Sequence, residues 1–473
     1  MPGNEICFLT ARELVSLMTS RELSAREVME AHLAQVERVN PKVNAIVTLT
    51  AEQAMLDAAA ADEALVRSGP LGPLHGLPVA HKDLHETKGV RTTFGSPIYA
   101  HYVPDFDALP VRRLKAAGAL SIGKTNTPEF GLGSQTFNQV FGATLNPWDT
   151  TKTCGGSSGG AGVALACGMV PIADGSDMGG SLRNPANFNN VVGFRTSPGR
   201  VPGPPGSWAT LSVPGPMART VGDVALMLSV MAGPDALSPI SISESGVPFA
   251  AELQHAFKGV RVALSPDFGG LPIDPAVREA IASTRTVFEA LGCEVDDASP
   301  DLSDAYEAFQ TLRAAGLAQS HGPLLTNHRH QLKDTAVWNI EKGLALTGEE
   351  MARAGRLREA VFQRMSGFMA QQEFLAVPVN QVPPFPVETP YPTEINGVEM
   401  ETYIDWMKSC FFITMTGHPA ISVPCGFTPD GLPVGVQIVG RYRDEFGVLQ
   451  LAHAFEQATG FWKRRPPVAR RAQ

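Results

Sequence analysis

The chain has 473 residues, 44% of them hydrophobic and 18% charged, a balance that allows a large buried core and excludes a disordered or coiled-coil protein. It carries 38 basic and 47 acidic residues, so its net charge of −9 provides no overall positive field for the phosphates of a nucleic acid. Glycine and proline occupy 46 and 38 positions, well above their combined average of about 12%, which indicates many turns.

Neither a metal site nor a membrane segment is expected. The six cysteines have no C-x-x-C pair and no histidine at zinc-site spacing, so we expect them to be reduced thiols. The N-terminus lacks a basic and apolar leader, and no window approaches 18 uninterrupted apolar residues. We therefore expect a cytoplasmic protein with neither a membrane nor a nucleic acid as partner.

The first part of the chain is predicted to be helical. From Thr10 to about Leu65, apolar residues recur at helical spacing, and Ser24 with Glu27 forms a capping-box pattern at the start of one helix. We expect residues 1–68 to form N-terminal helices packed on the core, and residues 69–473 to form the main domain.

After the first Gly/Pro cluster, short apolar runs alternate with helical patterns. This alternation predicts an α/β fold, a sheet with helices on both faces. Strands are expected at Leu77–Ala80, Ala119–Ile122, Val170–Ala173, Val260–Leu264, Ala420–Pro424 and Val434–Val439, and helices at Leu109–Ala117, Gly160–Cys167, Thr220–Met231, Ala276–Leu291 and Val448–Thr459.

A cap or insertion is predicted at about 300–400. Residues 301–371 have mainly helical patterns with few strand signals. Residues 376–392 contain six prolines, and because proline lacks a backbone N–H, we expect no regular element there.

The string from Gly118 to Thr125 matches the phosphate-loop pattern G-x-x-x-x-G-K-[ST]. A phosphate loop follows a strand and opens a helix, whereas here a helix precedes the string and residues 119–122 are themselves the predicted strand. Gly118 suits the left-handed position that ends a helix. We therefore expect no nucleotide site.

Two Gly/Ser clusters indicate acyl-transfer chemistry. Gly155–Gly160 contains G-x-S-x-G, which occurs in nucleophile elbows, although no buried strand precedes it. Gly179 and Gly180 come directly before Ser181, and glycines at such positions let backbone N–H groups converge on a developing oxyanion. A serine nucleophile also needs a base.

Lys82 is the candidate base, because no histidine falls within either cluster. It follows the apolar run Leu77–Ala80. A lysine carried into the interior on a buried strand loses hydration, which favours the neutral amine and allows it to accept a proton. A lysine at a strand end is more often exposed or ion-paired, so this role remains a hypothesis at this stage.

Together these segments resemble the amidase signature family of serine hydrolases. Its pattern is met by Lys82-Asp83, by Gly155–Gly160 and by Gly175–Pro185. The likeness covers nearly the whole chain and is weakest between about residues 240 and 400. It implies a large mixed, mostly parallel central sheet covered by helices on both faces, with a helical cap.

The resemblance also implies roles for individual residues. Ser181 matches the family's nucleophile, Ser157 its bridging serine held after a cis peptide, and Lys82 its general base. Backbone N–H groups at Met178, Gly179 and Gly180 would bind the oxyanion, and Gly131 is assigned to substrate binding. Such a site needs no metal or organic cofactor. The resemblance further implies that Asp83 and Asp177 support the site and that Arg183 pairs with a carboxylate.

Substrate choice depends on residues outside this triad. Aromatic and methionine side chains in the variable segments suggest a pocket for an apolar group: Phe137, Phe141, Trp208, Trp338, Met351, Met365, Met369, Trp406, Phe411 and Phe412. The first hypothesis is a stand-alone amidase, monomeric or homodimeric, that acts on small apolar aryl or alkyl amides and extends to anilides, carbamates or urethanes. The alternative is a glutaminase-type subunit of a tRNA-dependent amidotransferase complex.

Overall fold

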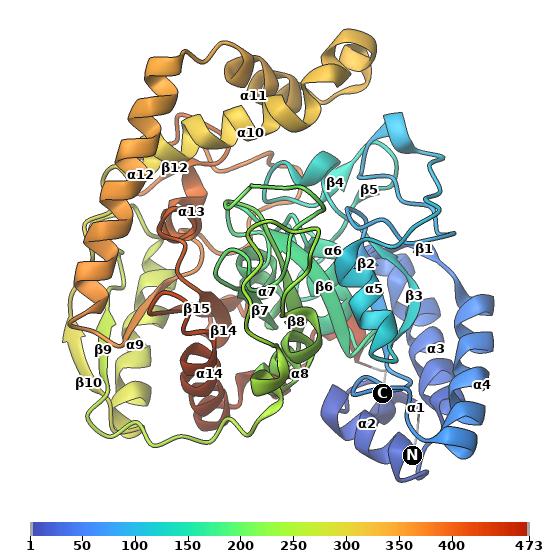
Figure 1. The fold of residues 1–473 in the computed structure, drawn as a ribbon. Coiled ribbons are helices and arrows are strands. Elements are labelled where there is room, and N and C mark those ends of the chain that lie inside the picture. The colour runs from blue at the N-terminus through green and yellow to red at the C-terminus, as the bar shows by residue number, and fades with distance from the viewer. Residues whose placement is uncertain (1–2, 471–473) are drawn as a thin grey trace.

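The computed structural model describes residues 3–470 and is built around a sheet of 11 strands (Figure 1). From one edge to the other, the strands are β1 (Ile46–Leu49), β3 (Leu120–Thr125), β2 (Pro78–Lys82), β6 (Ile172–Asp177), β8 (Val213–Ala218), β7 (Val192–Arg195), β14 (Ala420–Phe427), β15 (Pro433–Gly440), β11 (Phe374–Pro378), β9 (Arg261–Leu264) and β10 (Glu294–Asp297). The strongly buried strands explain why short apolar runs dominate the sequence between turns.

The sheet is mixed, as predicted. Its parallel pairings are β3–β2, β2–β6, β11–β9 and β9–β10, so they form one block toward each edge. The six other pairings are antiparallel: five join these two blocks through the middle of the sheet, and the sixth, β1–β3, adds a strand at one edge. The parallel pairing of β2 with β6 matters most for the site, because parallel neighbours end at the same edge.

Helices cover both faces of the sheet, which confirms the predicted α/β architecture. On one face, α6 (Gly159–Ala166) and α7 (Arg183–Asn189) contact each other and the strands beneath. A second group, α8 (Val221–Met231), α9 (Pro275–Ala290) and α14 (Glu445–Thr459), packs on several of the same strands without joining the first group, as expected for the opposite face.

The close approach of α6 to the sheet requires glycine. A Cβ added at Gly160 would lie 2.3 Å from the Asn126 backbone nitrogen and 2.6 Å from the Ala45 carbonyl oxygen. Separations under 3 Å do not occur for real Cβ atoms, so a larger residue would push the helix away. Part of the glycine excess therefore serves the packing that positions the first Gly/Ser cluster.

The N-terminal segment contains α1 (Gly3–Ile6), α2 (Ala11–Thr19), α3 (Ala25–Val43) and α4 (Ala51–Ser68). The predicted capping box of Ser24 and Glu27 is present at the start of α3. Strand β1, which the sequence pattern does not predict, lies between α3 and α4 and pairs antiparallel with β3. Residues 1–68 therefore contribute an edge strand to the central sheet as well as helices.

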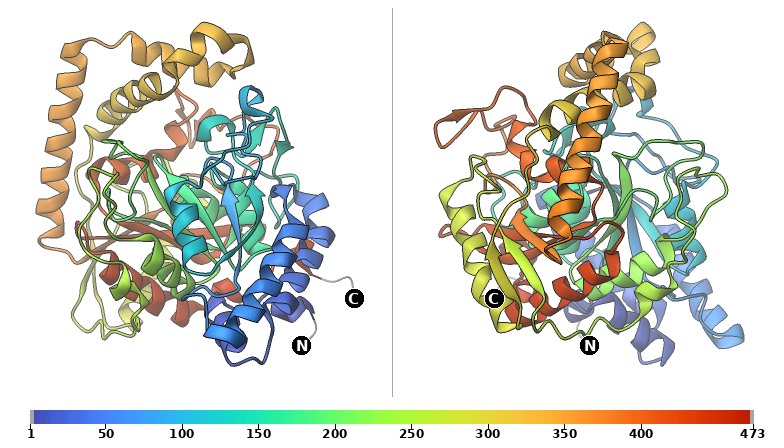
Figure 2. Two further views of the ribbon diagram at one scale, coloured as in Figure 1. Left: turned by 45° about the vertical axis from the view of Figure 1, so that its right-hand side comes forward. Right: turned by 60° about the vertical axis from the view of Figure 1, so that its left-hand side comes forward.

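The helical prediction for residues 301–371 matches α10 (Ala305–His328), α11 (Asp334–Leu344) and α12 (Gly348–Met369). These gold and orange helices frame the top and one side of the molecule in Figure 1 and extend beyond the sheet in both views of Figure 2. α10 also contacts α13 (Lys408–Thr416), which ties the cap to the C-terminal part of the sheet domain. No helix within residues 3–470 is long and apolar enough to span a membrane.

The expectation of no regular element at residues 376–392 is wrong at its start. Residues 374–378 form β11, a fully buried strand between β15 and β9. Pro378 is its last residue, so the missing N–H falls where the strand ends and costs little pairing. Beyond Pro378 the prolines lie in irregular backbone, as predicted.

The phosphate-loop string is confirmed as a helix end followed by a strand. α5 (Leu109–Ala116) ends before Gly118, which has φ +93°, and β3 covers residues 120–125 of the string. The Lys124 amine is fully buried and donates hydrogen bonds to the His85 carbonyl and to the Thr87 and Thr92 hydroxyls. Lys124 therefore stabilises the loop after β2 against β3 through these buried hydrogen bonds.

Candidate active site

The sheet brings the predicted catalytic segments together where β2 and β6 end. Lys82 is the last residue of β2, and the segment of Met178 to Ser181 follows β6 directly. Ser157 lies just before α6, which packs against β2 and β6. Segments separated by about a hundred residues thus converge because parallel neighbouring strands finish at one edge.

The Lys82 amine is fully buried and donates a 2.7 Å hydrogen bond to Ser157 Oγ and a 3.2 Å bond to Ser176 Oγ. Burial lowers the pKa of Lys82 to about 7, against the opposing effect of the nearby Asp177 and Asp174 carboxylates. A substantial fraction of the amine is therefore neutral near neutral pH and able to accept a proton. The peptide bond between Gly156 and Ser157 is cis, as the resemblance implied.

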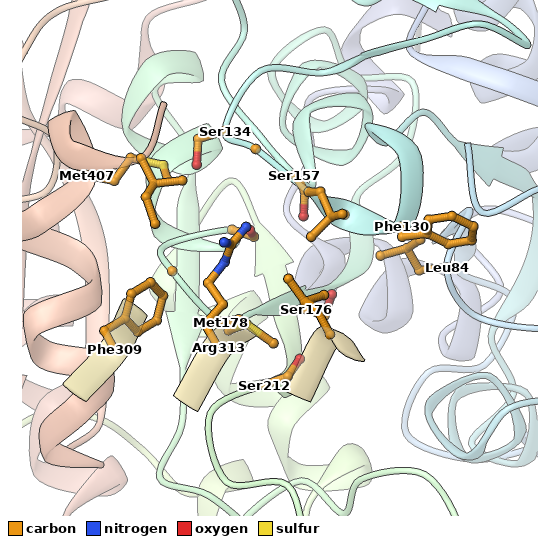
Figure 3. Close-up of a pocket in the computed structure, with 17 residues that line it drawn as sticks. Leu84, Phe130, Ser134, Ser157, Ser176, Met178, Ser212, Phe309, Arg313 and Met407 are labelled. Atoms are coloured by element: carbon orange, nitrogen blue, oxygen red, sulfur yellow. The ribbon is translucent and has the colours of Figure 1, made fainter. Parts of the chain in front are cut away.

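Ser181 is 8% exposed and lines the same pocket as Ser157 and Ser176. Figure 3 shows Ser157 and Ser176 on the wall of this pocket. Within residues 3–470 its hydroxyl has no hydrogen-bond partner, and only its carbonyl is engaged, by the Ser158 N–H at 3.2 Å. The structure therefore joins Lys82 to Ser157 directly and leaves the Ser181 hydroxyl free at the pocket surface.

The predicted oxyanion donors need one correction. The Gly180 N–H donates to Asp177 Oδ1 at 3.0 Å, so it is not free for an oxyanion in this structure. The backbone N–H groups of Met178, Gly179 and Ser181 have no partner within the described residues. The spacing of the glycines does not reveal this difference, because it does not show that the Asp177 carboxylate accepts a hydrogen bond from the Gly180 N–H.

Gly131 lies beside Ser157 on the pocket wall. Its φ is +71°, which favours glycine, and an added Cβ would stand 3.2 Å from Ser157 Oγ and 3.0 Å from a methyl carbon of Leu84. The structure thus places Gly131 in contact range of Ser157, where any side chain would crowd the pocket.

Asp177 organises the turn that carries Ser181. Its carboxylate accepts hydrogen bonds from the Leu182 N–H at 3.1 Å and from Arg183, with Nε at 3.0 Å and Nη2 at 2.8 Å. Arg195 also pairs with it, at 3.3 Å. Burial alone would raise the pKa of Asp177, but the two guanidinium groups outweigh it and hold the pKa well below its usual range. The expected pairing of Arg183 with a carboxylate is confirmed.

Because this ion-pair cluster is fully buried, Asp177→Asn should leave two guanidinium charges without a full counter-charge. Removing one partner of a buried pair typically costs about 3–5 kcal/mol. We expect a clear fall in the urea midpoint of unfolding, measured by fluorescence. Asp297→Asn makes the same change at a surface pair with Arg285, where Asp297 is 81% exposed, and should shift the midpoint little. Equal midpoints for the two variants would contradict this interpretation.

A second buried cluster was not found from the sequence. Asp174 on β6 accepts hydrogen bonds from the Lys82 backbone N–H at 2.9 Å and lies 2.8 Å from His85 Nδ1, with His81 Nδ1 on its other oxygen. Burial opposes ionisation of Asp174, yet the neighbouring histidines hold its pKa well below the usual range. The carboxylate therefore anchors the end of β2 and adds negative charge near Lys82. Polar residues within a buried strand were the signal available in the sequence.

The aromatic prediction for the pocket is wrong. Apart from the glycines and serines, the pocket is lined by Leu84, Phe130, Leu132, Met178, Phe309, Arg313, Leu317, Ile404 and Met407. None of the ten aromatic and methionine residues expected there appears. Trp208, Trp338 and Phe137 are 76%, 40% and 43% exposed, whereas Trp406 and Phe411 are buried in the core beside the pocket. Eight of the lining residues have apolar side chains, and five serines and Arg313 make the rest of the wall polar, so the pocket offers an apolar surface beside polar groups.

Within residues 3–470 no group of three or more histidine, cysteine, aspartate or glutamate side chains is arranged to hold a metal ion. The chemistry that the site residues themselves offer is a buried amine, two hydroxyls and free backbone N–H groups around one pocket. This combination suits acyl transfer to a serine.

The chain is similar to several known proteins. The Amidase family model matches residues 27–449. An acylamidase of Rhodococcus erythropolis is 36% identical over 471 residues, or 98% of each chain. A glutamyl-tRNA(Gln) amidotransferase subunit of Moorella thermoacetica is 37% identical over 486 residues, covering 98% of this chain and 99% of that protein. The crystal structure of a bacterial aryl acylamidase, an amidase signature enzyme, superposes with a TM-score of 0.87 at 29% identity, covering 96% of this chain and 98% of that one. The chain therefore belongs to the amidase family and is an amide-hydrolysing enzyme.

Proposed function

We propose that this enzyme hydrolyses small, largely apolar acyl amides and anilides through an acyl-enzyme formed on Ser181. The observation that carries the mechanism is the 2.7 Å hydrogen bond from the buried Lys82 amine to Ser157 Oγ, in the pocket that also holds Ser181. The similarity to an acylamidase and an aryl acylamidase supports the substrate class.

In the first half-reaction, the neutral Lys82 amine accepts a proton from Ser157, which takes one from Ser181 as Ser181 Oγ attacks the amide carbon. Backbone N–H groups at Met178, Gly179 and Ser181 hold the negative oxygen. Collapse of the tetrahedral intermediate breaks the C–N bond, and the proton returns through Ser157 to the leaving amine.

In the second half-reaction, water takes the place of the amine. The same relay removes a proton from water as it attacks the ester carbon of the acyl-enzyme, and the proton returns to Ser181 as the carboxylic acid leaves. Every proton passes between Lys82, Ser157 and the reacting group, so these residues alone complete the cycle.

A substrate panel tests the proposed class. Purified enzyme should release amine from butyryl anilide and butyryl amides faster than from urethanes or from free glutamine, because eight apolar side chains line the pocket and none of its lining residues is a carboxylate that could pair with the ammonium group of glutamine. Product is measured by chromatography, with enzyme inactivated by a serine-reactive fluorophosphonate as the control. Preference for glutamine over all acyl anilides would contradict the proposal.

The pH dependence of kcat/KM should follow the ionisation of Lys82. Because only the neutral amine accepts a proton, kcat/KM should rise with pH through the Lys82 pKa of about 7 and level off above it. Below that value, a drop of about tenfold per pH unit is expected for a single ionisation. The measurement uses a neutral anilide, with intrinsic fluorescence confirming that the enzyme stays folded at each pH. A profile that is flat from acid to mildly alkaline pH would rule out Lys82 as the base.

The alternative function is supported by the 37% identity to an amidotransferase subunit. It predicts that the chain hydrolyses glutamine and co-purifies with a second protein from its native host. Against it, the segment from Gly199 to Trp208 lacks the serine-rich, tyrosine and glycine pattern expected of that branch. We therefore favour an enzyme that acts alone, as a monomer or a homodimer.

A further inference from the structure

One charged side chain reaches the catalytic pocket from the cap. Arg313 lies on α10 and is only 5% exposed, yet it lines the same pocket as Ser157 and Ser181. In Figure 3 its guanidinium group points from the α10 side into the middle of the pocket, between Phe309 on one side and Ser157 on the other. It is the only charged residue in the pocket lining of the described structure.

The guanidinium group of Arg313 is held in place without being neutralised. Nη1 donates to Asn339 Oδ1 and Nη2 donates to the Tyr403 hydroxyl, while the Tyr403 ring lies 5.5 Å from the guanidinium carbon. These bonds use two of its five N–H groups. Among residues 3–470, no carboxylate lies within 4.0 Å of it, although the buried guanidinium groups of the catalytic turn both face Asp177.

The neighbouring charges do not supply the missing counter-charge. Burial lowers the pKa values of Lys333 and Lys342, and the Arg313 charge lowers them further. The Glu129 carboxylate opposes this effect at Lys333, and its oxygens accept hydrogen bonds from the Ser96 hydroxyl and the Lys333 N–H. The nearby Asp405 carboxylate is engaged by Tyr306, by Thr402 and, at 4.0 Å, by Lys408. Neither of these two carboxylates therefore forms an ion pair with Arg313, whose hydrogen bonds go to Asn339 and Tyr403.

A buried cation costs free energy unless an anion accompanies it. The rest of the pocket is apolar or carries hydroxyl groups, so it contains no anion of its own. The planar fork of arginine matches a carboxylate, to which it can donate two parallel hydrogen bonds. Ser181 and Arg313 line the same pocket, so one bound amide with a group beyond the scissile bond can contact both.

From these observations we propose that Arg313 binds a carboxylate carried by the substrate, so that the preferred substrate is an amide with an apolar body and a carboxylate at its far end. The inference rests on the proposed amidase function and names the substrate class of the same pocket. The carboxylate belongs either to the acyl portion or to the amine portion, and the test separates these two cases.

If Arg313 only stabilised the cap, its substitution would change the kinetics in a different way. By bonding Asn339 on α11 and Tyr403 near α13, it also braces the cap. Loss of these two hydrogen bonds would lower activity on all substrates alike. Loss of a carboxylate contact would raise KM for the acidic substrate alone, because the neutral substrate never used that contact.

Two matched substrate pairs provide the measurement. Glutaryl 4-nitroanilide is compared with its terminal carboxamide, and butyryl 4-aminobenzoate with butyryl 4-aminobenzamide. For wild type we expect one acidic member to have a kcat/KM at least about tenfold above its neutral partner, the usual effect of a charge-assisted hydrogen bond. Which pair shows the preference tells which portion carries the carboxylate.

Arg313→Met should bring that ratio close to one through a higher KM for the acidic member, while the neutral member keeps its KM. Arg313→Lys retains the charge without the fork and should keep part of the preference. Arg356→Met removes the same charge from an exposed position on α12 and should leave both ratios unchanged. If Arg313→Met fails to fold, the lysine variant and the wild-type ratio still decide.

A wild-type ratio near one in both pairs, or a preference that survives Arg313→Met, would overturn the inference. Equal losses on acidic and neutral members in both Arg313 variants would assign the residue to bracing and overturn it as well. Failure of wild type to cleave any of the four anilides would instead refute the proposed function on which the inference rests.

Discussion

Ser181→Ala is expected to abolish amide hydrolysis while leaving the fold intact. The substitution removes the attacking oxygen, and loss of a serine nucleophile lowers kcat by about 10⁴-fold or more. The Ser181 hydroxyl has no hydrogen-bond partner within the described structure, so its removal breaks no internal contact. Release of 4-nitroaniline from an acyl nitroanilide gives the rate, and circular dichroism checks the fold.

Ser212→Ala provides the comparison, because Ser212 lines the same pocket outside the proposed relay. Its kcat should fall by less than about tenfold, the scale of a lost neutral hydrogen bond. Mass spectrometry of fluorophosphonate-treated enzyme should find the label on Ser181 in wild type and none on that peptide in Ser181→Ala. Retention of nitroanilide hydrolysis by Ser181→Ala would show that another residue attacks the carbonyl.

Lys82→Met is the second change with a large expected effect, and it should separate activity from stability. Without the amine, no group accepts the proton from Ser157, so kcat should fall by about 10²–10⁴-fold, the usual contribution of a general base. The methionine side chain replaces the aliphatic part of a fully buried lysine and removes a group that is costly to desolvate. The thermal midpoint should therefore stay level or rise.

The stability of the wild type should also depend on pH through this residue. In the unfolded chain Lys82 titrates near its ordinary pKa of 10.5, and in the folded enzyme near about 7. Between these values the unfolded state binds the extra proton, so stability rises with pH across that window. Lys82→Met should weaken this rise, as measured by urea unfolding at several pH values.

Lys124→Met is the matched control at another fully buried lysine. The Lys124 amine binds a backbone carbonyl and two threonine hydroxyls, and its removal leaves those acceptors unsatisfied. We expect Lys124→Met to lower the thermal midpoint, opposite to Lys82→Met. If both variants lost stability equally, the Lys82 amine would be a structural group rather than a base kept neutral by burial.

Local sequence was sufficient for the elements that short-range chemistry specifies. The capping box at Ser24 begins α3 where predicted, and Gly118 ends α5 with a positive φ. Both follow from contacts within a few residues. The edge strand β1 and the proline-ending strand β11 were missed, because only pairing with β3 in one case and with β15 and β9 in the other makes them strands.

The proposed catalytic segments could be located from the sequence because each is a continuous run of unusual residues. Lys82, Ser157 and Ser181 needed no contact map to be singled out, and the resemblance gave each a role. The sequence does not show which hydrogen-bond partners the groups around these three residues have. The Gly180 N–H is engaged by Asp177, and Asp174 joins His81 and His85 across two strands.

The sequence by itself therefore determined the class of fold, the family and the positions of the proposed triad, because local periodicity, glycine spacing and contiguous motifs are properties of short segments. The tertiary structure decided the pairing of the sheet, which backbone N–H groups beside Ser181 have a hydrogen-bond partner, and which residues line the pocket. Arg313 shows why: it is more than a hundred residues from either serine along the chain, and only the packing of α10 over the pocket brings its charge to the site. Such residues reach the site only through long-range packing, which a local sequence pattern does not reveal.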